Sequence, residues 1–215
     1  MLPGSIGAME SIYPSVYRLQ RSAGSNGYLL LDDDRVAVVD PGLPAGGGKV
    51  LEELRSAGLL DRVTDVLVTH ADLDHVGAAA AVQGATGARV WLGRADAEIL
   101  EGKRQPATRF RRLLARRKTP EITRGLELLE GGEEPFPGVM TIATPGHTPG
   151  HMVFTFGDVV FAGDAVRGSN DGLRLMPGFL TSDPREAKAS LELIAGLGAR
   201  WLCPGHGRVR ELREA

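Results

Sequence analysis

Short polar segments that directly follow apolar runs constrain the fold of this chain most. The apolar run 66–69 (VLVT) is followed by the polar segment 70–75 (HADLDH), and an alanine-rich stretch occupies positions 76–81. This order predicts a strand, a loop and a helix. Because α/β proteins build their sites at the ends of strands, we expect an α/β protein with a site on this loop.

The five histidines of the chain are concentrated at such positions. His70 and His75 bracket the first loop, and His147 and His206 each follow a further β-like run. Asp164 also comes directly after a β-like run. Since neutral imidazole is the commonest protein ligand for transition metals, this clustering predicts a metal centre.

The spacing inside segment 70–75 is compatible with two metal ions. On an extended loop, residues two apart point the same way, so His70 and Asp72 could reach one ion. Asp74 and His75 would then face a second ion. The alternative is structural, with loop histidines that are satisfied by hydrogen bonds and Asp74 as the N-cap of the following helix.

Hydrophobic patterning along the rest of the chain predicts two similar halves, each with strands and helices. The expected strands are 16–19, 28–31, 35–39, 66–69, 89–92, 139–143, 152–156, 159–163 and 201–203, and the expected helices are 47–57 and 184–197.

Five motifs in this order resemble the metallo-β-lactamase superfamily. They are VVDPG, THADLDHVG, TPGHTPGH, AGDAV and CPGHG, and the resemblance runs from about Ser25 to Val209. It implies an α/β fold of the four-layer αβ/βα sandwich type, in which two mixed sheets pack face to face with helices outside. It also implies a groove that carries two divalent metal ions.

The resemblance also implies a role for each candidate residue of the site. Asp40 would be the hydrogen-bond partner of a ligand, with a turn residue before Pro41 as the alternative. We expect His151 to support the groove through hydrogen bonds and not to bind metal. The implied ligands are His70 and His147 at the first metal, Asp74, His75 and His206 at the second, and Asp164 between the two.

The match to the family fails at Asp72, where the family has its second histidine. With Asp74 and Asp164, Asp72 would bring three carboxylates to the site, which together with one hydroxide balance two divalent cations. A metal site with less net positive charge lowers the pKa of its bound water less strongly. Because oxygen ligands favour harder ions and imidazoles suit zinc, we expect Zn²⁺, with Fe or Mn²⁺ as alternatives. Asp72 could instead turn to solvent and leave the first site weak or empty.

A strongly basic segment spans residues 103–124. It holds nine basic residues against the single acid Glu121, a formal charge of about +8, so that the rest of the chain carries about −10 within a total of −2. Residues 110–117 have helical spacing, and we expect them in a basic helical insertion or lid at about 95–130.

Four residues are candidates for contact with the substrate. An anionic substrate could be attracted by Arg111, Arg112 and Arg116. The alternative is that these arginines lie on a solvated face and do not bind substrate. Asn170 lies in the loop 168–172, which could form a rim of the groove or a plain turn.

Length and composition favour a single domain over residues 1–215, of which 42% are hydrophobic. The lone Cys203 excludes an internal disulfide, and the chain has neither a signal-like start nor an apolar run of membrane-spanning length. We therefore expect a cytoplasmic protein without a membrane span. The mildly acidic total charge argues against nucleic acid as a partner. A homodimer is an open alternative to a monomer.

These observations together predict a metal-dependent hydrolase. Water activated by the metals would attack an ester, thioester, lactone or related bond of a small substrate, with Asp74 accepting and passing on a proton. Two alternatives stay open. One is an iron-dependent oxidoreductase of the persulfide dioxygenase or diiron kind, and the other is a metal-binding protein with little catalysis.

Overall fold

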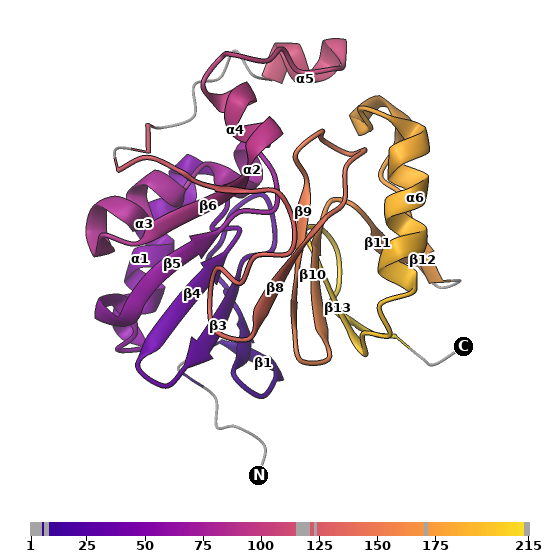
Figure 1. Ribbon diagram of the computed structural model, residues 1–215. Helices are drawn as coiled ribbons and strands as arrows, with labels where there is room; N and C mark the ends of the chain where they lie inside the picture. The colour runs from indigo at the N-terminus through magenta and orange to yellow at the C-terminus, as the bar shows by residue number, and fades with distance from the viewer. Residues whose placement is uncertain (1–5, 7–8, 115–120, 123, 170–171, 213–215) are drawn as a thin grey trace. The chain divides into compact units, whose positions relative to one another are not determined.

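The computed structural model describes residues 6, 9–114, 121–122, 124–169 and 172–212, without the side chains of 109, 110 and 114 (Figure 1). These residues form two compact units. The first takes its described residues from Met1–Val68, Asp72–Trp91 and Thr119–Glu127, and the second from Thr69–Ala71, Leu92–Lys118 and Leu128–Ala215. The candidate ligand segment 70–75 therefore contributes residues to both units.

Most of the first unit is built on a seven-stranded sheet whose strands follow one another in chain order. Neighbouring strands from β1 to β4 are antiparallel, whereas β4, β5 and β6 are parallel, so the sheet is mixed. The strands are β1 (Glu10–Tyr13), β2 (Val16–Arg18), β3 (Tyr28–Asp32), β4 (Arg35–Val39), β5 (Val63–Leu67), β6 (Arg89–Gly93) and β7 (Glu127–Leu129).

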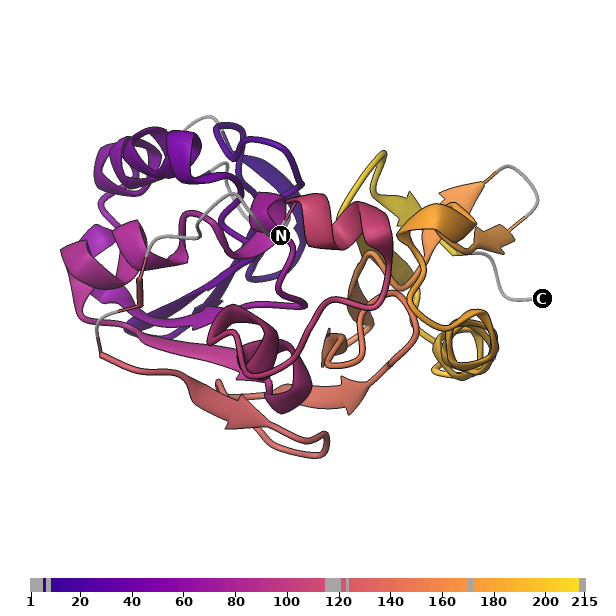
Figure 2. The ribbon, with the colours of Figure 1, turned by 90° about the horizontal axis from the view of Figure 1, so that it is seen from above.

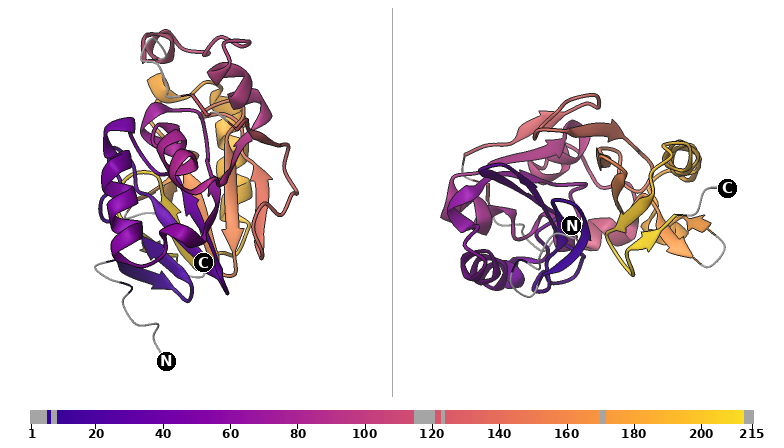
Figure 3. Two further views of the ribbon diagram at one scale, coloured as in Figure 1. Left: turned by 90° about the vertical axis from the view of Figure 1, so that its left-hand side faces the viewer. Right: turned by 90° about the horizontal axis from the view of Figure 1, so that it is seen from below.

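Two helices of the first unit, α1 (Gly47–Ser56) and α3 (Ala79–Thr86), pack against each other, and α3 also contacts β5 (Figure 3). Val50 and Leu54 of α1 are fully buried, and their spacing of four residues places them on one face of the helix. The described part of this unit also contains the shorter helices η1 (Pro44–Gly46), η2 (Leu60–Arg62) and α2 (Leu73–Val76).

The second unit has a five-stranded sheet in the order β14, β13, β10, β9, β8. β10 and β13 are parallel, and the other neighbours are antiparallel, so this sheet is mixed as well. A separate hairpin joins β11 (Arg167–Ser169) and β12 (Gly172–Arg174). The strands of the sheet are β8 (Val139–Ala143), β9 (Met152–Phe156), β10 (Val159–Gly163), β13 (Trp201–Pro204) and β14 (Arg210–Glu211).

The longest helix among the described residues of the second unit is α6 (Pro184–Ala195), which Figure 2 shows along its axis. Asp183 caps this helix by accepting hydrogen bonds from the backbone N–H groups of Arg185 and Glu186 at 2.8 and 3.1 Å. Ile194 packs into one apolar cluster with Val160 and Leu202 of the sheet. The remaining helices are α4 (Arg94–Leu100), α5 (Arg109–Leu114) and η3 (Gly178–Leu180).

The expected α/β class, with two mixed sheets and helices, is confirmed. The strand predicted at 66–69 lies at Val63–Leu67 instead, because the parallel pairing with β4 begins at Val63. The helix predicted over 110–117 begins at Arg109, and residues 115–117 lie outside the described part of the chain. The expectation of one domain with a lid at about 95–130 stays a prediction. Among the described residues, no helix has the length and apolar character needed to cross a membrane.

Candidate metal centre

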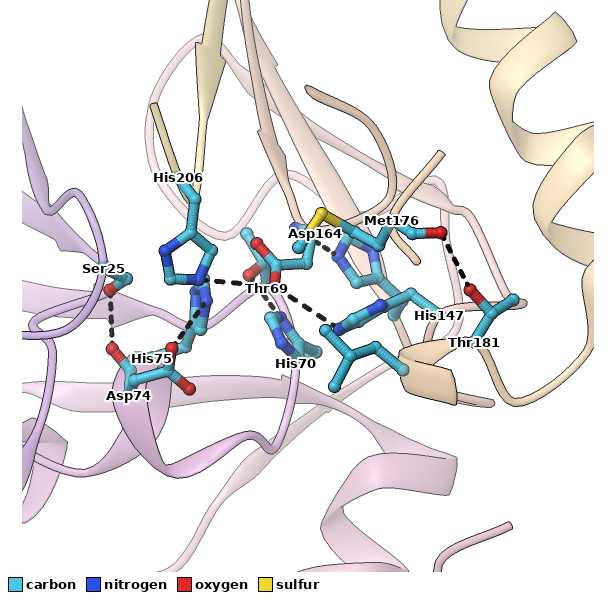
Figure 4. A network of polar contacts seen from close by, with 12 residues as sticks. Ser25, Thr69, His70, Asp74, His75, His147, Asp164, Met176, Thr181 and His206 are labelled. Carbon is cyan, nitrogen blue, oxygen red and sulfur yellow. Dashed lines mark hydrogen bonds and ion pairs between the residues drawn. The ribbon is translucent and has the colours of Figure 1, made fainter. Parts of the chain in front are cut away.

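Asp164 lies between two histidines in the second unit (Figure 4). Its Oδ2 atom is 3.5 Å from Nε2 of His147 and 3.5 Å from Nε2 of His206. Two ligand atoms that each lie about 2.1 Å from one tetrahedral ion are about 3.4 Å apart. Both separations therefore fit a shared cation, and a single carboxylate oxygen that faces two imidazoles can bridge two ions.

The ends of two parallel strands bring Asp164 and His206 together. The backbone N–H of Gly205 after β13 donates to the carbonyl of Gly163 at the end of β10 over 2.7 Å. Gly163 has φ +47°, and a Cβ atom there would come within 2.5 Å of Thr69 Oγ1 and 2.8 Å of His151 Nε2. The AGD motif therefore needs glycine for both its backbone conformation and its close contacts.

His70 is completely buried next to this group. One of its ring nitrogens lies within 4.8 Å of a carboxylate oxygen of Asp164 and of a ring nitrogen of His147. Its Nδ1 atom lies 3.0 Å from the hydroxyl of Thr69, and the carbonyl of Thr69 accepts from the backbone N–H of Met152 at 2.8 Å. These contacts fix the loop that presents His70.

His151 has both ring nitrogens engaged in hydrogen bonds. Its Nε2 atom accepts from the backbone N–H of Asp164 at 3.2 Å, which assigns the ring proton to Nδ1. Nδ1 then donates to the hydroxyl of Thr144 at 2.9 Å. This arrangement fits the expectation that His151 supports the site without binding metal.

In the first unit, His75 is oriented by Asp40. His75 is fully buried, and its Nδ1 atom lies 2.8 Å from Oδ2 of Asp40. Because an ionised carboxylate only accepts hydrogen bonds, this contact places the ring proton on Nδ1 and leaves Nε2 to face a metal. Asp40 has φ +46°, which fits a turn residue, and its contact with His75 fits the role of hydrogen-bond partner that the resemblance implied.

Asp72 and Asp74 lie at the start of the short helix α2. Asp72, not Asp74, occupies the N-cap position, and its side chain makes no capping hydrogen bond. The N-cap role that the structural alternative gave to Asp74 is therefore wrong. Asp74 is about one-third exposed, and its Oδ2 atom lies 3.9 Å from Nε2 of His75. Its backbone carbonyl accepts from the hydroxyl of Ser25 at 2.6 Å.

Arg111 contacts a candidate ligand directly. The side chain of this residue of α5 is buried, and its Nη2 atom lies 2.8 Å from Nε2 of His147. A guanidinium group keeps its protons, so Nε2 of His147 accepts this hydrogen bond. Arg111 is anchored by donating through Nη2 and Nε to the carbonyl of Leu180 at 2.7 and 3.2 Å.

The other candidate substrate contacts differ from Arg111. Arg112 is exposed, and it donates hydrogen bonds to the carbonyls of Ala107 and Thr108 at 3.5 Å. Arg116 and Asn170 lie outside the described residues.

Sequence reasoning missed Asp96, a completely buried residue in the first turn of α4. Burial raises the pKa of its carboxyl group, while the nearby His70 ring and the backbone N–H groups of Ala71 and Gly150 act in the opposite direction. An acid in the first turn of a helix is an ordinary surface pattern, so the sequence carried no signal for this position.

The donor set of each unit fits a divalent transition metal. The second unit offers imidazole nitrogens around a carboxylate oxygen, and the first offers an oriented imidazole with carboxylates beside it. These are the ligand types that Zn²⁺, Fe and Mn²⁺ bind in proteins.

The chain is similar to known proteins over most of its length. The family model of the metallo-beta-lactamase superfamily matches residues 23–206. The uncharacterized protein YobT of Bacillus subtilis is 30% identical, with 85% of this chain and 83% of that protein covered. The hydroxyacylglutathione hydrolase of Fuscovulum blasticum is 34% identical over 80% of this chain, but the matched part is 57% of that enzyme's length.

Solved structures show the same fold. The crystal structure of TTHA1623 in a di-iron-bound form is 30% identical, with a TM-score of 0.69 and coverage of 87% of this chain and 89% of that one. The metallo-beta-lactamase SMB-1 in a complex with mercaptoacetic acid is 27% identical, with a TM-score of 0.71 and coverage of 92% and 79%. The fold of this superfamily binds divalent metals, and the expected metallo-hydrolase class is confirmed. The chain belongs to the metallo-β-lactamase superfamily.

Proposed function

We propose that this metallo-hydrolase cleaves thioesters of small, anionic substrates at a centre for two divalent cations. The observation that carries this proposal is the position of Asp164, whose Oδ2 atom lies 3.5 Å from both His147 and His206. The hydroxyacylglutathione hydrolases among the relatives support the thioester, since an acylglutathione is one. Lactones and other esters are related substrates for the same chemistry.

The proposed ligands come from both units. Segment 70–75 is continuous in the chain and contributes His70 to the second unit and the other three ligands to the first. The two-metal site of the family supports the following assignment. The proposed ligands are His70, Asp72 and His147 for the first cation, Asp74, His75 and His206 for the second, and Asp164 for both.

When bound, the two cations would activate a water molecule and polarise the scissile carbonyl. Asp74 would act as the general base and then as the general acid, because its carboxylate is partly exposed and lies beside the buried His75. Its side chain can take a proton from the attacking water and give it to the leaving thiolate. Asp40 would keep the lone pair of His75 Nε2 directed at the second cation.

Arg111 would select anionic substrates. Nε2 of His147 has one lone pair, which can serve either the guanidinium group or a cation. Loading of the first site would therefore release one donor of Arg111, while the carbonyl of Leu180 still holds the side chain in place. The released donor can then bind a substrate carboxylate.

Zn²⁺ is our proposed metal, and the carboxylate of Asp72 keeps iron and manganese as alternatives. A second candidate function, an iron-dependent oxidoreductase, is favoured by Asp72 and by the di-iron form of one structural relative. Oxygen consumption with a persulfide by the iron-loaded protein would support that candidate. Cytoplasmic location and a homodimer stay predictions.

The test is thiol release from a hydroxyacylglutathione by protein that has been loaded separately with Zn²⁺, Mn²⁺ or Fe²⁺. We expect release with at least one ion, and its loss in Asp74→Asn, which keeps the shape of Asp74 but removes its basicity. Arg112→Gln is the control, since Arg112 is exposed. Full activity of Asp74→Asn, or no thiol release with any ion, would contradict the proposal.

A further inference from the structure

The buried carboxylate of Asp96 joins two segments that carry candidate ligands. Its Oδ2 atom accepts from the backbone N–H of Ala71 at 2.8 Å, and its Oδ1 atom accepts from the backbone N–H of Gly150 at 2.7 Å. Ala71 directly follows His70, and Gly150 is three residues after His147. One side chain therefore holds both segments, and each of its oxygens serves one of them.

Glycines allow the close approach that these hydrogen bonds need. A Cβ atom on Gly150 would overlap the backbone nitrogen of Asp96, and a Cβ atom on Gly93 would overlap the carbonyl oxygen of Gly150. The junction between β6 and α4 thus packs its backbone against the TPGHTPGH motif without intervening side chains. Such packing leaves little room for the two segments to shift relative to each other.

We infer that Asp96 is a positioning residue of the metal centre, which sets the separation of His70 and His147 through Ala71 and Gly150. This inference rests on the proposed function, because it assigns His70 and His147 to the first cation. Groups that orient metal ligands are known to affect metal affinity strongly even when they do not touch the ion.

Asp65 provides a matched control for a purely structural role. It is also fully buried in a hydrogen-bonded network, in which Trp91 Nε1 donates to it at 2.8 Å and Arg89 forms an ion pair at 2.9 Å. All three residues belong to the first unit, and none is a candidate ligand or adjoins one. Loss of either carboxylate should lower the free energy of unfolding. Only the loss of Asp96 should change the affinity and the geometry of the metal site.

The test compares Asp96→Asn and Asp65→Asn with the parent protein. Asparagine can accept only one of the two N–H groups at position 96, and its own NH₂ group would face the other. We expect Asp96→Asn to weaken the binding of Zn²⁺ by about 10- to 100-fold in competition with a chelator. The visible absorption of bound Co²⁺ should change in this variant and stay unchanged in Asp65→Asn. Parent-like affinity and Co²⁺ absorption in folded Asp96→Asn would overturn the inference.

A second measurement needs no variant, in case Asp96→Asn does not fold. Hydrogen exchange of the parent protein should show protected amides at Ala71 and Gly150 without metal, since the buried carboxylate holds both. Rapid exchange at these two amides would overturn the inference. A parent protein that binds no ion would instead refute the proposed function, so the two failures are distinguishable.

Discussion

Substitution of Arg111 by methionine should have opposite effects on metal binding and on substrate binding. The guanidinium group of Arg111 donates to His147 Nε2 at 2.8 Å, so it competes with a cation for that nitrogen. A hydrogen bond that involves a charged group stabilises a folded protein by about 1.5–3 kcal/mol. A change of about 1.4 kcal/mol in binding free energy corresponds to a factor of ten in affinity. Removal of this competitor should therefore raise the metal affinity of the first site by about 10-fold or more.

The anionic substrate should respond in the other direction. Methionine fills similar space without a charge, so KM for an anionic thioester should rise, whereas a neutral thioester should be affected little. Arg112→Met is the matched control, because Arg112 lies next to Arg111 in α5 but is exposed. Metal affinity is measured by competition with a chelator, and KM by thiol release.

Two results would refute this reasoning about Arg111. Unchanged or weaker metal binding in Arg111→Met would show that the guanidinium group does not compete for His147. An equal rise in KM for anionic and neutral substrates would show that Arg111 shapes the site without recognising charge.

Three further predictions test other parts of the site and the fold. Asp72→His restores the usual family residue and should tighten the binding of Zn²⁺ at the first site in chelator competition; an unchanged affinity would mean that Asp72 does not face a metal. Asp40→Ala should weaken metal binding by about 10- to 100-fold, and Asp40→Asn should weaken it less, because the amide oxygen still accepts from His75 Nδ1–H; equal affinities in both variants and the parent would exclude this orienting role. For Glu133, burial raises the pKa, but the hydroxyl of Thr141 and backbone N–H groups outweigh it and hold the pKa below its usual 4.5. Because the folded pKa lies below the unfolded one, the stabilisation is present above about pH 4.5 and is lost as the pH falls through the folded pKa. The difference in unfolding free energy between the parent and Glu133→Gln, measured by urea titration, should therefore shrink on acidification, and a difference that is constant with pH would contradict this.

The sequence predicted the parts of the site that short motifs encode. His70 and His75 stand in one segment of six residues. Asp164 directly follows β10, and His206 comes two residues after β13, so local pattern was sufficient to select all four as candidates. The two sheets were also predictable in outline, because their longer strands have continuous apolar runs. Several strands of two to four residues contain too few residues for a periodic pattern and were missed, and Arg210–Glu211 is one of them. The short strands β2 and β13 were predicted.

Residues that act through tertiary contacts were not predictable in the same way. Asp96 is separated from Ala71 by 25 residues and from Gly150 by 54, and its local pattern is that of an ordinary helix start. The charge of Arg111 predicts contact with an anionic substrate. Its burial and its contact with His147, 36 residues away in the sequence, depend on how α5 packs. The role of such residues can be assigned only from the folded structure, in which segments distant in sequence are in contact.

The most direct test of the proposed centre is the metal content of the purified protein after reconstitution and removal of loosely bound ions. Elemental analysis should find two divalent ions for each chain of the parent protein, and fewer in His206→Ala, which removes one partner of Asp164. A folded parent protein that retains no ion after exposure to Zn²⁺, Fe²⁺ and Mn²⁺ would contradict the account.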